Sequence, residues 1–177
     1  MSDHHLQGPT EALLFASGQP LPADKIAGIL QIQTDQVHTL IADMISSMSV
    51  EGRGLTIVEV AGGYQLCTKP VFSDIVNKLS DIQENKLSTA ALETLAIVAF
   101  KQPVTKQEIE GIRGVKSDRV VTTLLDRMLI KETGRKEAIG RPILYGTTNE
   151  FLQCFGLKNL DDLPAIANLL PNKHPEE

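Results

Sequence analysis

Cysteine is scarce in this sequence, and its placement excludes two classes of protein. The 177 residues contain two cysteines, Cys67 and Cys154, far apart and accompanied by no C-x-x-C pair and no nearby histidine. A disulfide scaffold needs a denser set of cysteines, and a structural zinc site needs clustered Cys or His ligands. We expect neither, and we interpret both cysteines as small apolar core residues.

Long apolar runs and catalytic motifs are also missing. No run of about 18 apolar residues is present for a membrane span, and the N-terminal stretch lacks the basic-then-apolar order of a signal peptide. We therefore expect a cytoplasmic protein. No Ser/His/Asp order, no P-loop and no G-x-G-x-x-G after a strand occurs either. The sequence predicts no enzyme activity and no cofactor.

The histidines do not predict a metal site. His4 and His5 are adjacent but have no third candidate ligand close by. His38 and His174 stand alone in the sequence. Because a bound zinc ion needs three or four protein ligands, we expect no metal ion here.

Residues 87–148 carry the clearest structural signal. A first helix is predicted by apolar residues at helical spacing after the candidate cap Ser88, and it ends before Pro103. Thr105 and Glu108 have the spacing of a capping box, which predicts that a second helix starts there. Gly114 permits a tight turn, and Ser117 is the expected cap of a third helix. The apolar positions of the three helices are Leu92, Leu95, Ala96, Ala99, Phe100, Ile109, Ile112, Val120, Val121, Leu124, Leu125 and Met128.

A hairpin is predicted directly after these helices. Leu129 and Ile130 lead into one strand, residues 134–142 form a loop rich in turn residues, and residues 143–145 form the returning strand. Three helices followed by a hairpin are the order of a winged helix-turn-helix domain.

The same pattern occurs earlier in the chain. With a constant shift of 83 and no gap, residues 12–45 match residues 95–128 at ten of 34 positions, including Pro20 with Pro103 and Ile26 with Ile109. Chance would give roughly two identities at ordinary residue frequencies. Thr34 is the expected cap of the third helix in this first copy, and residues 55–68 form its hairpin around Gly62 and Gly63. A duplicated unit is the economical explanation.

The predicted fold is therefore mainly α with small β-hairpins, in two tandem winged-helix domains. We expect the first domain to span residues 10–80 and the second to span 88–164, joined by a linker at 81–87. Loose tails are expected at residues 1–9 and 165–177. Two domains of this size are marginally stable alone, which favours association with other chains.

Charge separates two functional hypotheses. Residues 1–87 have a net charge of −5, residues 88–177 have zero, and residues 113–141 have a local excess of +4. A DNA-binding transcriptional regulator would use that basic region to contact phosphates. However, the sequence pI of about 5.4 and the absence of Lys and Arg from residues 34–48 argue against a dedicated DNA reader. A solvated hairpin is an equally good interpretation of the basic wing, and a protein-binding role fits better.

Three phrases resemble a known family. They are ALETLAIVAFKQP, GRPILYGTT and FGLKNLDDLP, and with the residues around them the likeness covers about 10–164. The sequence resembles the segregation and condensation protein B family, a subunit of a bacterial condensin-like complex. The resemblance implies a homodimer formed through the first domain, and binding of the kleisin subunit, segregation and condensation protein A, mainly by the second. It further implies a link through the kleisin to the structural-maintenance-of-chromosomes ATPase, and a nucleoid-associated role in chromosome condensation and partition, with DNA contact at most weak or indirect.

Candidate contact residues follow from this resemblance and from the apolar pattern. For the kleisin we expect exposed apolar and wing positions of the second domain: Phe100, Val104, Arg135, Arg141, Tyr145 and Phe151. For the homodimer we expect the apolar cluster on the third helix of the first domain, formed by Met44, Ile45 and Met48. Core packing is the alternative interpretation for all the apolar members of both sets.

Overall fold

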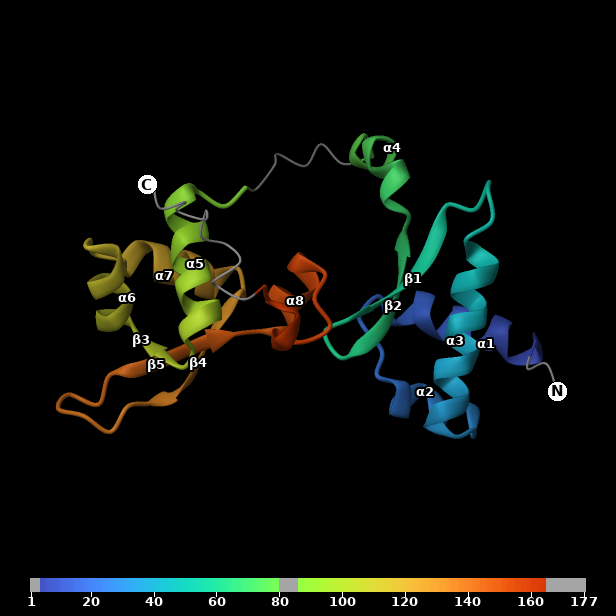
Figure 1. Cartoon of the computed structure of the whole chain (residues 1–177), viewed down its shortest axis with the longest axis horizontal. Coiled ribbons are helices and arrows are strands. Elements are labelled where there is room, and N and C mark those ends of the chain that lie inside the picture. The colour runs from blue at the N-terminus through green and yellow to red at the C-terminus, as the bar shows by residue number, and fades with distance from the viewer. Residues whose placement is uncertain (1–3, 80–85, 165–177) are drawn as a thin grey trace, which may run out of the picture. The chain divides into compact units, whose positions relative to one another are not determined.

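The computed structural model describes residues 4–79 and 86–164, and their contacts divide the chain into two compact units, Met1–Asn85 (unit 1) and Lys86–Glu177 (unit 2). Both units combine α-helices with a small antiparallel sheet, as the sequence predicted (Figure 1). Most of the predicted linker at 81–87 and the whole predicted tail at 165–177 lie outside the described residues. No helix within residues 4–79 and 86–164 has the length and apolar content needed to cross a membrane.

Within residues 4–79, unit 1 has three helices, a hairpin, a single 3-10 turn and a short closing helix. The strands of the hairpin are antiparallel, from the pair Leu55 and Thr68 to the pair Val60 and Gly63. Leu21 and Tyr64 exchange two backbone hydrogen bonds of 2.9 Å, which fix the segment between the first two helices to the hairpin. The elements are α1 (His4–Ser17), α2 (Ala23–Leu30), α3 (Thr34–Met48), β1 (Leu55–Val60), β2 (Gly63–Thr68), η1 (Pro70–Phe72) and α4 (Ser73–Asn77).

Two local expectations for unit 1 were wrong. The loose tail expected at residues 1–9 is helical from His4 onward, because Leu6 packs against the core and the buried Thr10 hydroxyl donates to the Leu6 carbonyl at 2.8 Å. Thr34 is not the cap of α3. Gln33 occupies that position in a reciprocal capping box with Gln36, and the Thr34 hydroxyl donates instead to Asp24 at 3.1 Å.

The core of unit 1 is built on α2, α3 and the hairpin. Ile26 and Val37 are fully buried at its centre. Met44 and Met48 are also buried in this core, and Ile45 packs partly against it. Core packing is therefore the interpretation that the structure supports for the two methionines.

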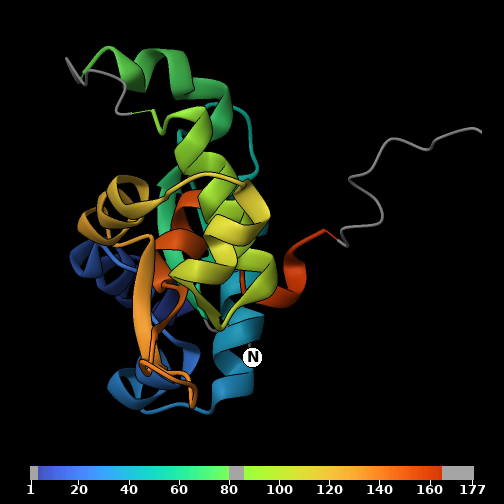
Figure 2. The same cartoon turned by 90° about the vertical axis from the view of Figure 1, so that its left-hand side faces the viewer.

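Unit 2 repeats the order of three helices and a hairpin. A short strand after the first helix pairs with the hairpin, giving a three-stranded antiparallel sheet in the order β3-β5-β4. In Figures 1 and 2 the hairpin extends beyond the helices of its unit. The elements are α5 (Thr89–Lys101), β3 (Val104–Thr105), α6 (Lys106–Arg113), α7 (Asp118–Asp126), β4 (Ile130–Arg135), β5 (Ile143–Thr147), α8 (Asn149–Phe155) and η2 (Leu160–Asp162).

Local capping sets the helix starts of unit 2. Ser88 accepts from the Ala91 amide at 3.2 Å, and Thr105 and Glu108 form the predicted reciprocal capping box. Ser117 lies at the cap position of α7, but its hydroxyl accepts from Arg113 at 2.9 Å instead of binding the helix amides. The Ser117 amide donates to Glu110 at 2.9 Å, so the Glu110 carboxylate helps to fix the turn between α6 and α7.

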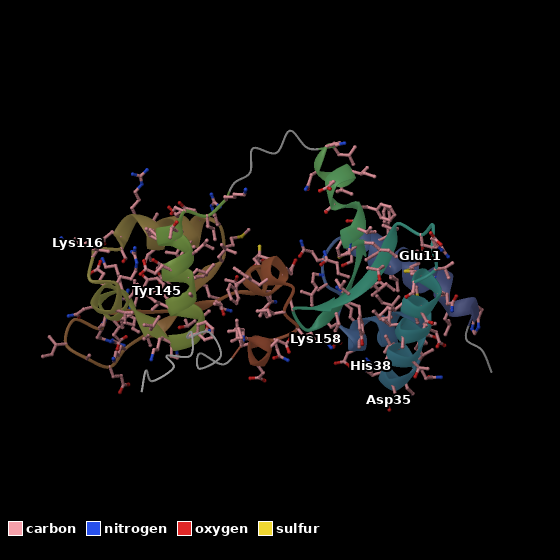
Figure 3. All side chains as sticks on the ribbon, turned by 45° about the horizontal axis from the view of Figure 1, so that its top comes forward. Glu11, Asp35, His38, Lys116, Tyr145 and Lys158 are labelled. Atoms are coloured by element: carbon pink, nitrogen blue, oxygen red, sulfur yellow. The ribbon has the colours of Figure 1, made fainter. Side chains whose placement is uncertain are left out.

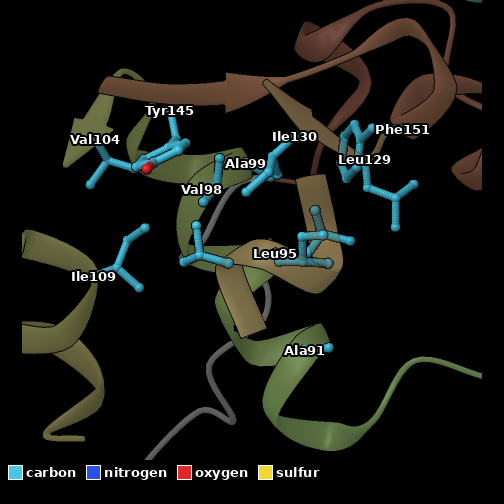
Figure 4. Packing of buried hydrophobic residues seen from close by; sticks show 12 residues of the cluster. Ala91, Leu95, Val98, Ala99, Val104, Ile109, Leu129, Ile130, Tyr145 and Phe151 are labelled. Atoms are coloured by element: carbon cyan, nitrogen blue, oxygen red, sulfur yellow. The ribbon is translucent and has the colours of Figure 1, made fainter. Parts of the chain in front are cut away.

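The core of unit 2 gathers side chains from all its helices and its sheet. Leu95 and Val98 on α5 face Ile109 on α6, with Ile130 and Tyr145 closing the core from the hairpin (Figure 4). Ile109, Val98 and Leu124 are fully buried. The aligned residues Ile26 and Ile109 thus hold the same central position in their units.

The duplication is visible in the elements, with one correction. α2 and α6 coincide at the predicted shift of 83, and so do Leu21 and Val104, which pair with Tyr64 and Tyr145 in their hairpins. The shift rises to 84 at the third helices, because the turn that ends at Ser117 contains one residue more than the turn that ends at Gln33. The Gln102–Pro103 peptide is cis, whereas Gln19–Pro20 is trans.

Candidate protein-binding surfaces

An apolar groove lies between α5 and α8 in unit 2. It has a volume of about 210 Å³, and its lining contains no charged side chain. Leu92 and Phe155 form its exposed rim, with 47% and 50% of their surfaces accessible. The lining residues are Leu92, Leu95, Ala96, Ala99, Phe100, Phe151, Phe155, Leu163 and Pro164.

Hydrogen bonds at both ends of α8 set the second wall of the groove. The Thr148 hydroxyl accepts from the Phe151 amide at 3.1 Å and donates to the Met128 carbonyl at 2.5 Å, which ties the start of the helix to the turn between α7 and β4. The rings of Phe151 and Phe155 pack with centroids 4.8 Å apart. Gly156 then takes the left-handed conformation, with φ 65°, and ends the helix.

The segment after α8 is also fixed by local bonds. The Asp162 carboxylate accepts from the Lys158 amide at 2.8 Å, and Asn159 caps the short η2 helix. Leu163 follows directly and packs partly against the core of unit 2. The groove is therefore a preformed feature of this unit.

A second hollow lies beside the wing, the β4–β5 hairpin. It measures about 320 Å³ and is lined by Lys106, Gln107, Arg135, Pro142, Ile143 and Tyr145. Arg135 donates to the Arg141 carbonyl at 3.1 Å across the hairpin loop, and both arginines are exposed. Burial of the Tyr145 side chain raises the pKa of its phenol. Unlike the apolar groove, this hollow has positively charged residues, Lys106 and Arg135, in its lining.

The wing is tied to α6 through Glu108. Its carboxylate binds the Lys136 ammonium at 2.6 Å and also accepts from the Thr105 amide at 2.8 Å. The hydrogen bond from Lys136, with those from Thr105, lowers the pKa of Glu108 from 4.5 to about 2. A further ion pair joins Lys106 on α6 to Asp118 on α7, which raises the pKa of the lysine and lowers that of the aspartate.

The ion pair between Glu108 and Lys136 predicts an acid-dependent loss of stability. The lowered pKa means that the Glu108 contribution is complete above about 4.5 and is lost as pH falls toward 2. Both side chains are about half exposed, so we expect at most about 1 kcal/mol. Glu108→Gln should lower the thermal midpoint at neutral pH, and this deficit should shrink on acidification. Glu137→Gln, at an exposed wing position, is the control, and a deficit that does not change with pH would contradict the assignment.

The structure separates the expected kleisin-contact residues into different surroundings. Phe100 and Phe151 both line the apolar groove, although Phe151 lies in its buried floor. Tyr145 lies within unit 2 and pairs with Val104 through the β3–β5 ladder (Figure 3). Val104, Tyr145 and Phe151 are all buried, so the expectation that they are exposed was wrong. Arg135 and Arg141 are exposed.

Sequence reasoning missed several groove residues. Phe155 and Leu163 were not among the expected contact residues, and Leu92 was assigned only to the apolar positions of its helix. One signal could have found the groove. The apolar positions of α5 cover a wider face than a single core stripe, because Leu92 and Ala96 lie beside Leu95 and Ala99 and remain exposed.

Two other hollows concern the alternative hypotheses. One of about 390 Å³ in unit 2 lies at the start of α5 and includes three basic residues, Lys86, Arg119 and Arg127. The other, of about 440 Å³, lies between α1 and the hairpin of unit 1, where Phe15 is 77% exposed beside Leu55. In unit 1 the counterpart of α7 is α3. It carries the exposed Asp35 at the position where α7 carries Arg119 (Figure 3). Within the described part of the chain, no group of three His, Cys, Asp or Glu residues could hold a metal ion.

Comparison with known proteins places the chain in a family. The family model described as segregation and condensation complex subunit ScpB matches residues 9–166. The chain belongs to the ScpB family. The segregation and condensation protein B of Moorella thermoacetica is 49% identical over 165 residues, covering 93% of this chain and 85% of that protein.

Solved ScpB structures also match. The crystal structure of ScpB from Mycobacterium tuberculosis is 34% identical, covers 89% of this chain and 98% of that one, and gives a TM-score of 0.43. A structure described as a dimer of the ScpB N-terminal domain complexed with an ScpA peptide is 31% identical, covers 42% of this chain and 93% of that one, and gives a TM-score of 0.40.

Proposed function

We propose that this protein is a non-enzymatic subunit of a condensin-like complex and that it binds the kleisin ScpA through the apolar groove of unit 2. Through the kleisin it joins the structural-maintenance-of-chromosomes ATPase on the nucleoid, in chromosome condensation and partition. Membership of a family described as a segregation and condensation complex subunit supports this proposal. The groove between α5 and α8 is the single observation that carries the proposed mode of binding.

The proposed architecture is a pair of winged-helix domains. In unit 2, α6 and α7 form the helix-turn-helix and β4 and β5 form the wing, and in unit 1 α2, α3 and the β1–β2 hairpin take the same roles. Winged helices bind either DNA or proteins, so the surface of each copy decides its role.

The groove suits an amphipathic helix of the partner. Such helices place apolar side chains at positions i, i+3 and i+4 into apolar grooves. Leu92 and Phe155 flank the opening, while Leu95 and Phe151 form a rigid floor that is already packed in the core. A rigid, preformed floor lowers the entropic cost of binding.

The exposed wing arginines are proposed as a polar rim of the kleisin interface, outside the lining of the groove. Arg135 lines the hollow beside the wing and donates to the Arg141 carbonyl, and charges at the rim of an interface affect association rate and specificity more than affinity. Val104 and Tyr145 are buried beneath the wing, so we assign them support of the hairpin instead of direct contact.

The homodimer is proposed to form through unit 1. Because Met44 and Met48 are buried, we assign the contact with a second copy to the hollow around Phe15 and Leu55. Ile45, the third residue expected at the dimer interface, is partly buried and remains a candidate. A large exposed aromatic side chain in an apolar hollow is typical of an interface.

DNA binding by unit 2 is the second candidate function. The hollow with Lys86, Arg119 and Arg127 favours it, since clustered cations attract phosphates. The exposed Asp118 and Asp126 argue against DNA binding, because they lie on α7, the helix that would enter the major groove of the DNA. We therefore propose DNA contact only as a weak accessory to protein binding.

Titration calorimetry with the central segment of ScpA tests the main proposal. Leu92→Glu is expected to weaken binding at least tenfold, because the new charge must be desolvated inside the apolar groove. Ile112→Glu is the matched control. Ile112 is a similarly exposed apolar residue, but it lies on α6 and does not line the groove, so its replacement should leave affinity unchanged.

Two further titrations complete the experiment. Arg135→Glu combined with Arg141→Glu should weaken binding severalfold and reduce its salt dependence, as expected of rim charges. Duplex DNA is titrated at about 50 and 200 mM salt, where binding by phosphate contacts alone is lost at the higher concentration. Full ScpA affinity of Leu92→Glu, or tight duplex binding at high salt, would overturn the assignment of the groove as the main binding surface.

A further inference from the structure

The groove of unit 2 lies at the point where the described chain ends. Leu163 and Pro164 form part of its lining, so the described chain ends at the edge of the groove. At about 3.3–3.6 Å per extended residue, the next six residues reach at most roughly 20 Å, so they are held close to the groove whose lining they adjoin.

The sequence that follows matches the groove chemically. Residues 165–170 read AIANLL, with no charge and five apolar residues in six. Ile166, Leu169 and Leu170 have the i, i+3, i+4 spacing that places apolar side chains on one face of a helix. The charged residues Lys173, Glu176 and Glu177 come only after Pro171.

We propose that residues 165–170 bind the apolar groove of their own unit 2 and compete there with the kleisin. The groove offers an almost wholly apolar lining, and this segment is tethered to it at Pro164. A short tether gives an effective concentration in the millimolar range, so even weak affinity produces substantial occupancy. The competition rests on the proposed function, whereas the intramolecular docking does not.

Methyl NMR on the full chain tests the docking without any partner. The probes are Leu92 and Leu95, which line the groove and are distant in sequence from the segment. Their methyl resonances are expected to shift in Leu169→Ser combined with Leu170→Ser, and to shift in the same direction when the chain is truncated after Pro164. Asn168→Ser is the matched control and should leave them unchanged. Unshifted Leu92 and Leu95 in both the double variant and the truncated chain would overturn the proposal.

A synthetic peptide of residues 165–171 provides a second test. Added to the truncated chain, it should restore the Leu92 and Leu95 resonances toward their positions in the full chain, and the peptide with both leucines replaced by serine should not. Failure of the native peptide at millimolar concentration would contradict recognition of this sequence by the groove.

Calorimetry with the ScpA central segment separates the two proposals. The truncated chain and the double serine variant should bind more tightly than the full chain, by a factor of about three if the segment occupies the groove two-thirds of the time. If ScpA binds neither chain while the methyl shifts occur, the proposed function fails and the docking stands. If ScpA binds all variants equally and no methyl shifts, the docking fails and the proposed function stands.

Discussion

Replacement of Ile109 by alanine is expected to lower the free energy of unfolding of unit 2 by about 3 kcal/mol. Ile109 is fully buried at the centre of that unit, against α5 and the hairpin (Figure 4). The loss combines the removed apolar contact with the cavity that a packed core cannot refill. Ile26→Ala should have an effect of the same size in unit 1, because Ile26 is the aligned and equally buried residue.

The duplication supplies a matched control for both variants. Ile112 and Ile29 lie three residues further along the same helices and are about half exposed. Their replacement by alanine should change stability by less than about 0.5 kcal/mol. The free energy of unfolding of each unit is measured for the four variants by chemical denaturation, with NMR signals from each unit as the probe. Equal effects at the buried and exposed positions would contradict the assigned faces of α2 and α6.

Gly63→Ala is expected to destabilise unit 1 by about 2–3 kcal/mol. A Cβ at this position would lie 2.8–3.0 Å from backbone atoms of Leu21. Leu21 is held to Tyr64 by two backbone hydrogen bonds of 2.9 Å, so its backbone can move away from the new Cβ only if both bonds are stretched. A side-chain neighbour could rotate away, but a backbone neighbour cannot.

Gly28→Ala is the control for this prediction. Gly28 lies within α2, and a Cβ there would meet no atom within 4 Å. Alanine in a helix is favoured over glycine by about 0.5–1 kcal/mol, so this variant should be neutral or more stable. Thermal unfolding measures the stability of both variants, and hydrogen exchange of the Tyr64 amide reports on the backbone bonds to Leu21. A Gly63→Ala protein as stable as Gly28→Ala would contradict the close approach of Leu21.

Local interactions were the most predictable part of the fold. The capping box of Thr105 and Glu108 and the cap at Ser88 depend on residues within three positions, so the sequence contains all the participants. The Thr34 cap failed because Gln33 and Gln36 form a competing local box, for which serine and threonine preferences give no warning. Residue preferences at N-cap positions rank single candidate residues, but they do not compare one capping pair with a competing pair.

Burial depended on pairing that the sequence does not display. Val104 and Tyr145 are 41 positions apart, and only the β3–β5 ladder brings them together in the core. Likewise, Phe151 and Phe155 are adjacent on one helical face, yet one is buried and the other lines an open rim. The apolar residues of the candidate site were predictable, whereas their division into floor and rim required the packed structure.

The extra residue before Ser117 has a consequence for how the two copies diverged. One inserted residue turns every following side chain by about 100° around the helix axis. Val121, not the aligned Val120, therefore takes the buried place that Val37 holds in the other copy, and Leu124 takes that of Leu40. This one-residue difference between the two turns therefore gives the two third helices different outward faces, even at positions where the aligned residues are identical.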